Sequence, residues 1–135
     1  MKASPDAKSP QRATTGEAGA QAETLAARFL EARGLKLVER NWRSRFGELD
    51  LVLREGDTIV MVEVRMRRSK AFGGAAASID AKKRSRLLAA AREYLARGPD
   101  RPCRFDVVLI TGDTGAVAGS KLAPEIEWIR DAITE

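Results

Sequence analysis

Two acidic residues, Asp50 and Glu63, interrupt a stretch that is otherwise largely apolar, residues 47–65 (GELDLVLREGDTIVMVEVR). This stretch predicts two strands joined by a two-residue hairpin loop, in which Gly56 takes the first central position of a type II′ turn. The loop fixes a pairing that sets Asp50 opposite Glu63 on one face, with Cβ atoms about 5 Å apart. Two carboxylates on a largely buried face repel each other, and a divalent cation held by oxygen atoms would offset that repulsion.

Two structural explanations remain open for the same pair of acids. One acid can carry a raised pKa and so lose its charge, or Arg65, two residues further on the face of Glu63, can form a salt bridge with it. The pairing itself depends on the register, because a slip of one residue sends the two acids to opposite faces of the sheet. The spacing alone does not choose between a metal ion and these explanations.

The composition excludes several kinds of active site. The chain has no histidine, so a Ser-His-Asp triad, a Cys-His pair and an HExxH zinc site are all absent. Its single cysteine, Cys103, excludes an internal disulfide and a thiolate zinc cluster, and fits a reducing compartment such as the cytoplasm. Any metal ion must therefore be a hard cation bound by oxygen.

The charge balance indicates a polyanionic partner. Lys and Arg number 24 against 19 Asp and Glu, and the pI is near 9.8. Such a balance is typical of proteins that bind nucleic acid or an anionic membrane surface. Residues 1–15 lack the apolar core of a signal peptide or a transmembrane span, so they predict a disordered tail on a cytoplasmic protein that does not enter the membrane.

The hydrophobic pattern predicts one α/β domain over residues 16–135, since 135 residues suffice for one core. A helix over 16–33 would end at Gly34, and a second helix capped by Ser78 or Asp80 would run to about residue 97. Besides the hairpin, strands are expected over 35–41 and 104–110, and a Gly-rich loop over 111–124. A short edge strand over 125–129 and a brief C-terminal helix would complete the domain.

Two charged residues lie beside the apolar stripes of these helices. Glu23 is at the edge of the stripe of the first helix, where a solvated flank is the ordinary reading and an inward orientation the functional one. Lys83 stands one turn before Leu87 on the buried side of the second helix, so it points toward the sheet unless it extends past the helix end into solvent.

The basic residues concentrate on either side of the acidic pair. The link over 41–47 interleaves aromatic residues with arginines, a composition that stacks on bases and pairs with phosphates, although ordinary packing also produces it. Between residues 65 and 92 basic residues greatly outnumber acidic ones, with Asp80 as the one acid. The candidate nucleic-acid-binding residues are Arg43, Arg45, Arg67, Arg68, Lys82, Lys83 and Arg86.

Several short motifs resemble the YraN-like family of bacterial proteins, which is similar to the Holliday-junction resolvases of the restriction-endonuclease-like superfamily. The resemblance covers nearly all of the chain after residue 15 and implies a central mixed sheet flanked by helices, with a PD-(D/E)xK type site. The matching positions are Gly19, Glu23, Ala26, Phe29-Leu30, Asn41-Trp42-Arg43, Gly47-Glu48-Leu49-Asp50-Leu51, Val62-Glu63-Val64-Arg65, Arg67, Phe72-Gly73, Lys83 and Arg104-Phe105-Asp106-Val107-Val108.

The resemblance also implies roles for individual residues. Asp50 takes the place of the first acid, Glu63 that of the second, and Arg65 the place that lysine usually holds. Mg²⁺ or Mn²⁺ would be held by Asp50, Glu63 and the carbonyl of Val64, with Glu23 contributing through water. The implied reaction is hydrolysis of a phosphodiester bond in DNA, including branched or single-stranded forms, and junction resolvases further suggest a homodimer.

Arg65 departs from the family pattern. Arginine stays protonated, so it cannot assist as a base, although it can hold a phosphate oxygen. Lys83 would supply the missing amine. If it does not, the chain is a catalytically inactive nucleic-acid-binding protein with a nuclease-like fold. A third hypothesis is a structural or protein-interaction domain whose acidic pair is locked by Arg65, but an opposed pair of acids is a poor choice for stability alone.

Overall fold

The structure of the chain, a computed structural model, describes the backbone of residues 12–67, 79–112 and 124–133, and within these ranges the side chains from residue 16 onward. Residues 1–11 of the predicted tail, Arg68, Phe72-Gly73 and most of the predicted loop over 111–124 lie outside the described residues. The elements are α1 (Arg12–Glu31), β2 (Lys36–Arg43), β3 (Glu48–Glu55), β4 (Thr58–Arg67), α3 (Ala81–Leu95), β5 (Cys103–Thr111) and β6 (Glu125–Ile133).

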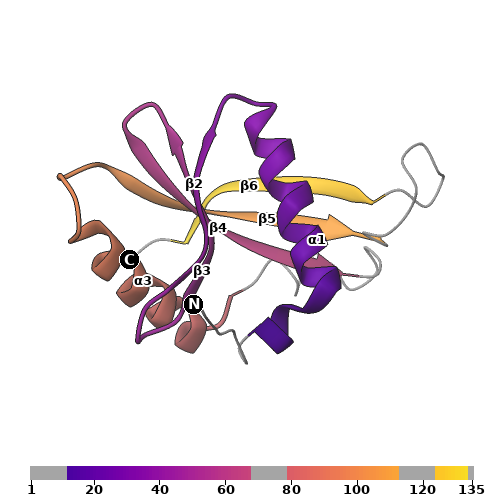
Figure 1. Ribbon diagram of the computed structural model, residues 1–135, viewed down its shortest axis with the longest axis horizontal. Coiled ribbons are helices and arrows are strands. Elements are labelled where there is room, and N and C mark those ends of the chain that lie inside the picture. The colour runs from indigo at the N-terminus through magenta and orange to yellow at the C-terminus, as the bar shows by residue number, and fades with distance from the viewer. Residues whose placement is uncertain (1–11, 68–78, 113–123, 134–135) are drawn as a thin grey trace, which may run out of the picture.

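The five strands form one mixed sheet in the order β2-β3-β4-β5-β6. β4 and β5 are parallel, and the other neighbouring strands are antiparallel. α1 crosses one face of the sheet and α3 lies on the other (Figure 1). The predicted α/β, restriction-endonuclease-like architecture is therefore confirmed. No helix within the described ranges is long and apolar enough to cross a membrane.

Each face of the sheet has its own apolar core, because alternate residues of a strand point to opposite sides. Leu30 of α1 packs on the face that carries Leu53 and Val62, whereas Leu87 of α3 packs on the face that carries Met61. Both helices are thus fixed against the central strands. This packing determines where polar residues on the helices meet those at the strand ends.

The hairpin between β3 and β4 has the predicted turn and register. Gly56 has φ 61° and Asp57 is not among the residues of positive φ, as a type II′ turn requires. The pairs run from Glu55 with Thr58 to Leu51 with Val62, and the ladder ends there. Beyond this point the β2–β3 pair turns toward α3 while β4 continues beneath α1 (Figure 1). The two strands therefore form a fork next to the acidic pair.

The C-terminal helix prediction is wrong. β6 extends as a strand from Glu125 to Ile133, and Ile133 pairs with Phe105 after a register shift. Asp131 in the irregular segment has φ 53°, and its backbone N–H donates to the carboxylate of buried Asp106 at 2.8 Å. This contact holds the irregular segment of β6 against β5. The sequence around Asp131 could not reveal it, because Asp106 lies 25 residues away. At the other end, α1 begins at Arg12 and has a non-helical kink at Gly16, where the prediction began the helix.

Candidate metal and nucleic-acid site

The carboxylate of Asp50 lies in the fork between β3 and β4. Its Oδ2 accepts a hydrogen bond of 3.0 Å from the backbone N–H of Val64, and so satisfies a donor that has no ladder partner on β3. A strand residue directs its N–H and C=O to the same side. The carbonyl of Val64 therefore faces the same gap as the Asp50 carboxylate, away from β5.

Glu63 lies next to this gap on β4 and is only 6% exposed. Its Oε2 is 3.0 Å from the Nζ of Lys83, in the first turn of α3. That turn is held by Asp80, whose carboxylate accepts from the backbone N–H of Lys83 at 2.7 Å. Lys83 thus points toward the sheet, and α3 delivers a cation to the second acid of the pair.

Glu23 of α1 is turned into the molecule and is 5% exposed. Both of its carboxylate oxygens accept from the side-chain amide of Asn41, at 3.0 and 3.1 Å, and the guanidinium of Arg40 lies 3.7 Å away. Asn41 has φ 52°, a left-handed conformation that asparagine tolerates better than most residues. The solvated-flank reading of Glu23 therefore does not hold.

Three neighbouring acids act on Asp50. The pKa of Asp50 is raised well above its usual value, first because the carboxyl is buried and then because of the negative charge of Glu63. Glu23 and Glu48 raise the pKa of Asp50 further, whereas the hydrogen bond from Val64 lowers it. Asp50 therefore lies close enough to Glu63 to be affected by its charge, and the ammonium of Lys83 partly offsets that charge.

Arg65 does not form the salt bridge that the sequence left open. Among the residues that the structure describes, no ion pair joins Arg65 to Asp50 or to Glu63. The cation at Glu63 is Lys83, from a helix 20 residues further along the chain. The acidic pair is therefore not locked by Arg65.

The donor set suits a small divalent cation. No group of three or more His, Cys, Asp or Glu side chains within the described ranges is arranged to hold a metal ion, so Glu23 does not complete a three-carboxylate site. Asp50, Glu63 and the carbonyl of Val64 remain, all of them hard oxygen donors. Mg²⁺ is commonly bound through one or two carboxylates and keeps several waters. An ion at this point would also compete with Lys83 for the oxygens of Glu63.

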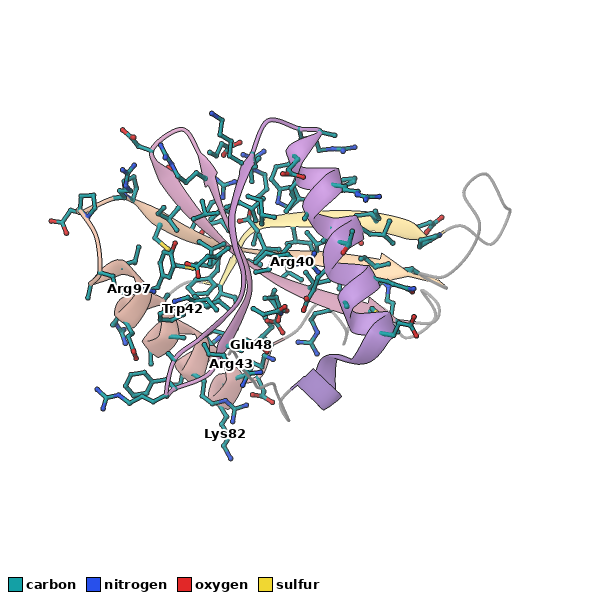
Figure 2. All side chains as sticks on the ribbon, in the orientation of Figure 1. Arg40, Trp42, Arg43, Glu48, Lys82 and Arg97 are labelled. Carbon is teal, nitrogen blue, oxygen red and sulfur yellow. The ribbon has the colours of Figure 1, made fainter. Side chains whose placement is uncertain are left out.

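The predicted basic residues fall into two groups. Near the site, Arg43 and Arg45 belong to the end of β2 and the turn after it, and exposed Lys82 and Arg86 lie on α3. Figure 2 shows Arg43 and Glu48 close to the start of α3, with Lys82 extending outward. Arg67, in contrast, bonds to Thr111 at 2.8 Å and lies 3.6 Å from Glu127. Its guanidinium thus ties β4 to β5 and β6.

Sequence reasoning missed two residues that shape the site. Asn41 orients Glu23, and Glu48 adds negative charge beside Asp50. A signal for the first was present, because asparagine is depleted in strands and so stood out within β2. Burial raises the pKa of the Cys103 thiol to about 11, which disfavours the reactive thiolate form.

Replacement of Asp50 by asparagine should stabilise the metal-free protein at neutral pH. Because the folded-state pKa of Asp50 is above its usual 3.8, wild-type stability falls as the pH rises from 3.8 through the folded-state pKa. Asparagine cannot ionise, so Asp50→Asn escapes this loss and should melt about 4 °C higher at pH 7, for about 1 kcal/mol of relieved repulsion. Melting curves in EDTA from pH 3 to 8 would test this. A difference in melting temperature between Asp50→Asn and the wild type that does not increase with pH would contradict the prediction.

The family profile and the similar proteins found for this chain belong to the same family. Residues 22–110 match the profile of the uncharacterised protein family UPF0102. A UPF0102 protein of Nitrosomonas europaea is 54% identical over 123 residues, which span 90% of this chain and 98% of the relative. UPF0102 proteins of Pseudomonas aeruginosa and Pseudomonas syringae pv. tomato are 47% and 45% identical, each over 90% of this chain and 95% of the relative. The resemblance to the YraN-like family is thereby confirmed.

Proposed function

The chain belongs to the uncharacterised protein family UPF0102, and from the geometry of its site we propose that it is a Mg²⁺- or Mn²⁺-dependent nuclease that hydrolyses phosphodiester bonds in DNA. The observation that carries the proposal is the convergence of Asp50 and Glu63 in the fork between β3 and β4. The pKa of Asp50 is raised by burial and by Glu63, and strongly perturbed carboxyl groups of this kind are concentrated at functional sites. Basic residues of β2, of the β2–β3 turn and of α3, namely Arg43, Arg45 and Arg86, line a depression that also includes Glu48.

In this proposal the residues of the site have different roles. A bound divalent cation would lower the pKa of a coordinated water and neutralise negative charge on the phosphate. Asp50, Glu63 and the Val64 carbonyl would hold that cation. Lys83, released from Glu63, would then be a mobile ammonium next to the reacting phosphate. Arg65 cannot accept a proton, but it can hold a phosphate oxygen from the same strand.

A second candidate function is binding without cleavage. It is favoured by one observation, the ion pair between Lys83 and Glu63. If that pair persists when DNA is bound, the site has an arginine in place of the usual lysine and no free amine. The basic residues would still bind the DNA backbone. The third hypothesis was a structural domain in which Arg65 locks the acidic pair. It loses its support because, in the described part of the chain, Arg65 forms no ion pair with Asp50 or Glu63.

DNA binding should be sensitive to salt and to the exposed cations of α3. Each phosphate contact contributes about −0.9 to the slope of log K against log salt, so Lys82→Glu with Arg86→Glu should make the slope less steep by about 2. Titration of a labelled duplex at several salt concentrations measures this slope. Lys36→Glu, an exposed lysine at the opposite end of β2 from Arg43, is the matched control for Lys82→Glu and should have little effect. Binding that does not respond to salt would argue against a nucleic-acid partner.

The deciding experiment is cleavage in Mn²⁺ of linear, nicked, single-stranded and four-way-junction DNA, by the wild type beside Glu63→Gln. Cleavage that depends on Mn²⁺ and on Glu63 supports the nuclease. Binding of the same DNAs without cleavage supports the second candidate.

A further inference from the structure

The two aromatic residues of the 41–47 segment have different surroundings. Trp42 is partly buried against the core, edge-on to Tyr94 with ring centroids 5.2 Å apart, and Arg97 lies 5.5 Å from its ring. Phe46, at the tip of the β2–β3 turn, is 42% exposed, a high value for a large apolar side chain. The guanidinium of Arg45 lies 5.3 Å from the Phe46 ring. Of the two rings, Phe46 is therefore the one available to a ligand.

Phe46 is presented on a well-defined turn. The hydroxyl oxygen of Ser44 accepts from the backbone N–H groups of Phe46 and Gly47, at 2.9 and 3.2 Å, and the N–H of Ser44 donates to the carbonyl of Gly47 at 2.9 Å. Gly47 packs against α3, since a Cβ at this position would lie 3.6 Å from the Cβ of Arg86. Because the backbone of this turn is held in place, less conformational freedom is lost when a ligand stacks on the Phe46 ring.

The ring borders a depression of about 640 Å³. Arg43, Arg45 and Arg86 line it together with Ser44 and Gly47. Glu48 lines it as well, and the charge of Glu48 also acts on Asp50. A second depression of about 470 Å³, which includes Arg92 and Glu93, also adjoins Phe46. Three arginines and an exposed ring next to the fork are the combination that binds the backbone and a base of one strand.

We infer that Phe46 is a stacking platform for an unpaired base, and that the preferred substrate is DNA with single-stranded nucleotides next to the scissile phosphate. This inference depends on the proposed function, because it takes the fork as the site that receives the phosphate. Inside a duplex the base faces are covered by their neighbours, so an exposed ring stacks on a base chiefly where the strands are open. The arginines contact phosphates in either form, so they do not by themselves select open DNA.

Binding is best measured in the Asp50→Asn background, so that no cleavage occurs, with a labelled single strand of about 12 nucleotides and a blunt duplex of the same sequence. Phe46→Ala should weaken single-strand binding about 5- to 150-fold, the range for loss of one stacked base, and duplex binding less than about twofold. Phe46→Trp should retain the affinity for the single strand. Val38→Ala is the matched control, since Val38 is equally exposed but lies outside both depressions.

Unchanged single-strand affinity in Phe46→Ala, or an equal loss for both DNAs, would overturn the inference, as would failure of tryptophan to replace phenylalanine. The two proposals fail separately. Cleavage by the wild type together with no effect of Phe46→Ala would overturn only the stacking role. A selective loss of single-strand affinity in Phe46→Ala without cleavage by the wild type would overturn only the nuclease activity.

Discussion

In the presence of Mn²⁺, Glu63→Gln should cleave DNA about 10²- to 10⁴-fold more slowly than the wild type. A catalytic cation contributes several kcal/mol to stabilisation of the transition state, and each 1.36 kcal/mol corresponds to a factor of ten in rate. Glutamine preserves the size of Glu63 but removes its charge, which would weaken its hold on both a divalent cation and Lys83. Single-turnover cleavage of the DNA that the wild type cuts best would measure the loss.

Two controls make this result interpretable. Glu31→Gln carries the same chemical change at an exposed position at the end of α1 and should cleave as the wild type does. A melting curve of Glu63→Gln shows whether the variant is folded. Equal rates for Glu63→Gln and the wild type would rule out the site in the fork. A wild type that binds Mn²⁺ and DNA but cuts none of the substrates would identify an inactive binding protein.

The largest effect on stability is expected at Asp106. This residue is fully buried on β5 and accepts hydrogen bonds from the guanidinium of Arg104 at 3.0 and 3.2 Å, from the indole N–H of Trp128 at 2.9 Å and from the backbone of Asp131 at 2.8 Å. Asp106→Ala removes the acceptor from all three donors at once. Loss of one partner of a buried pair costs about 3–5 kcal/mol, so the melting temperature should fall by about 10 °C or more.

An exposed pair on the same protein provides the comparison. Asp57 lies 3.4 Å from Arg101, and its side chain is 86% exposed. Surface pairs contribute little, so Asp57→Ala should melt within about 2 °C of the wild type. A fall of similar size in both variants would show that the contacts of Asp106 have no special weight. Because Asp106 holds β6 rather than the fork, Asp106→Ala should retain its metal requirement below its melting temperature.

The sequence alone determined the features that depend on neighbouring residues. Gly56 fixed the turn and hence the register from Glu55 to Leu51, because a type II′ turn needs a positive φ at one defined position. The helical spacing of the apolar residues predicted both helices. The position of Asp80 just before the apolar stripe indicated a cap, and its carboxyl does cap α3. The identity of the acidic pair followed from the same local pattern, as did the absence of histidine chemistry.

Only the tertiary structure decided how the residues of the site meet. The register predicted that Asp50 lies directly opposite Glu63, but the ladder ends one pair earlier and Asp50 turns to the backbone of Val64. Glu23 faces inward because Asn41, 18 residues away, holds it. Which cation reaches Glu63 depended on how α3 packs on the sheet, a long-range contact that no spacing along the chain encodes. Local patterns thus specified the elements and candidate residues, whereas packing between distant elements set the fork, the partner of each acid and the exposure of Phe46.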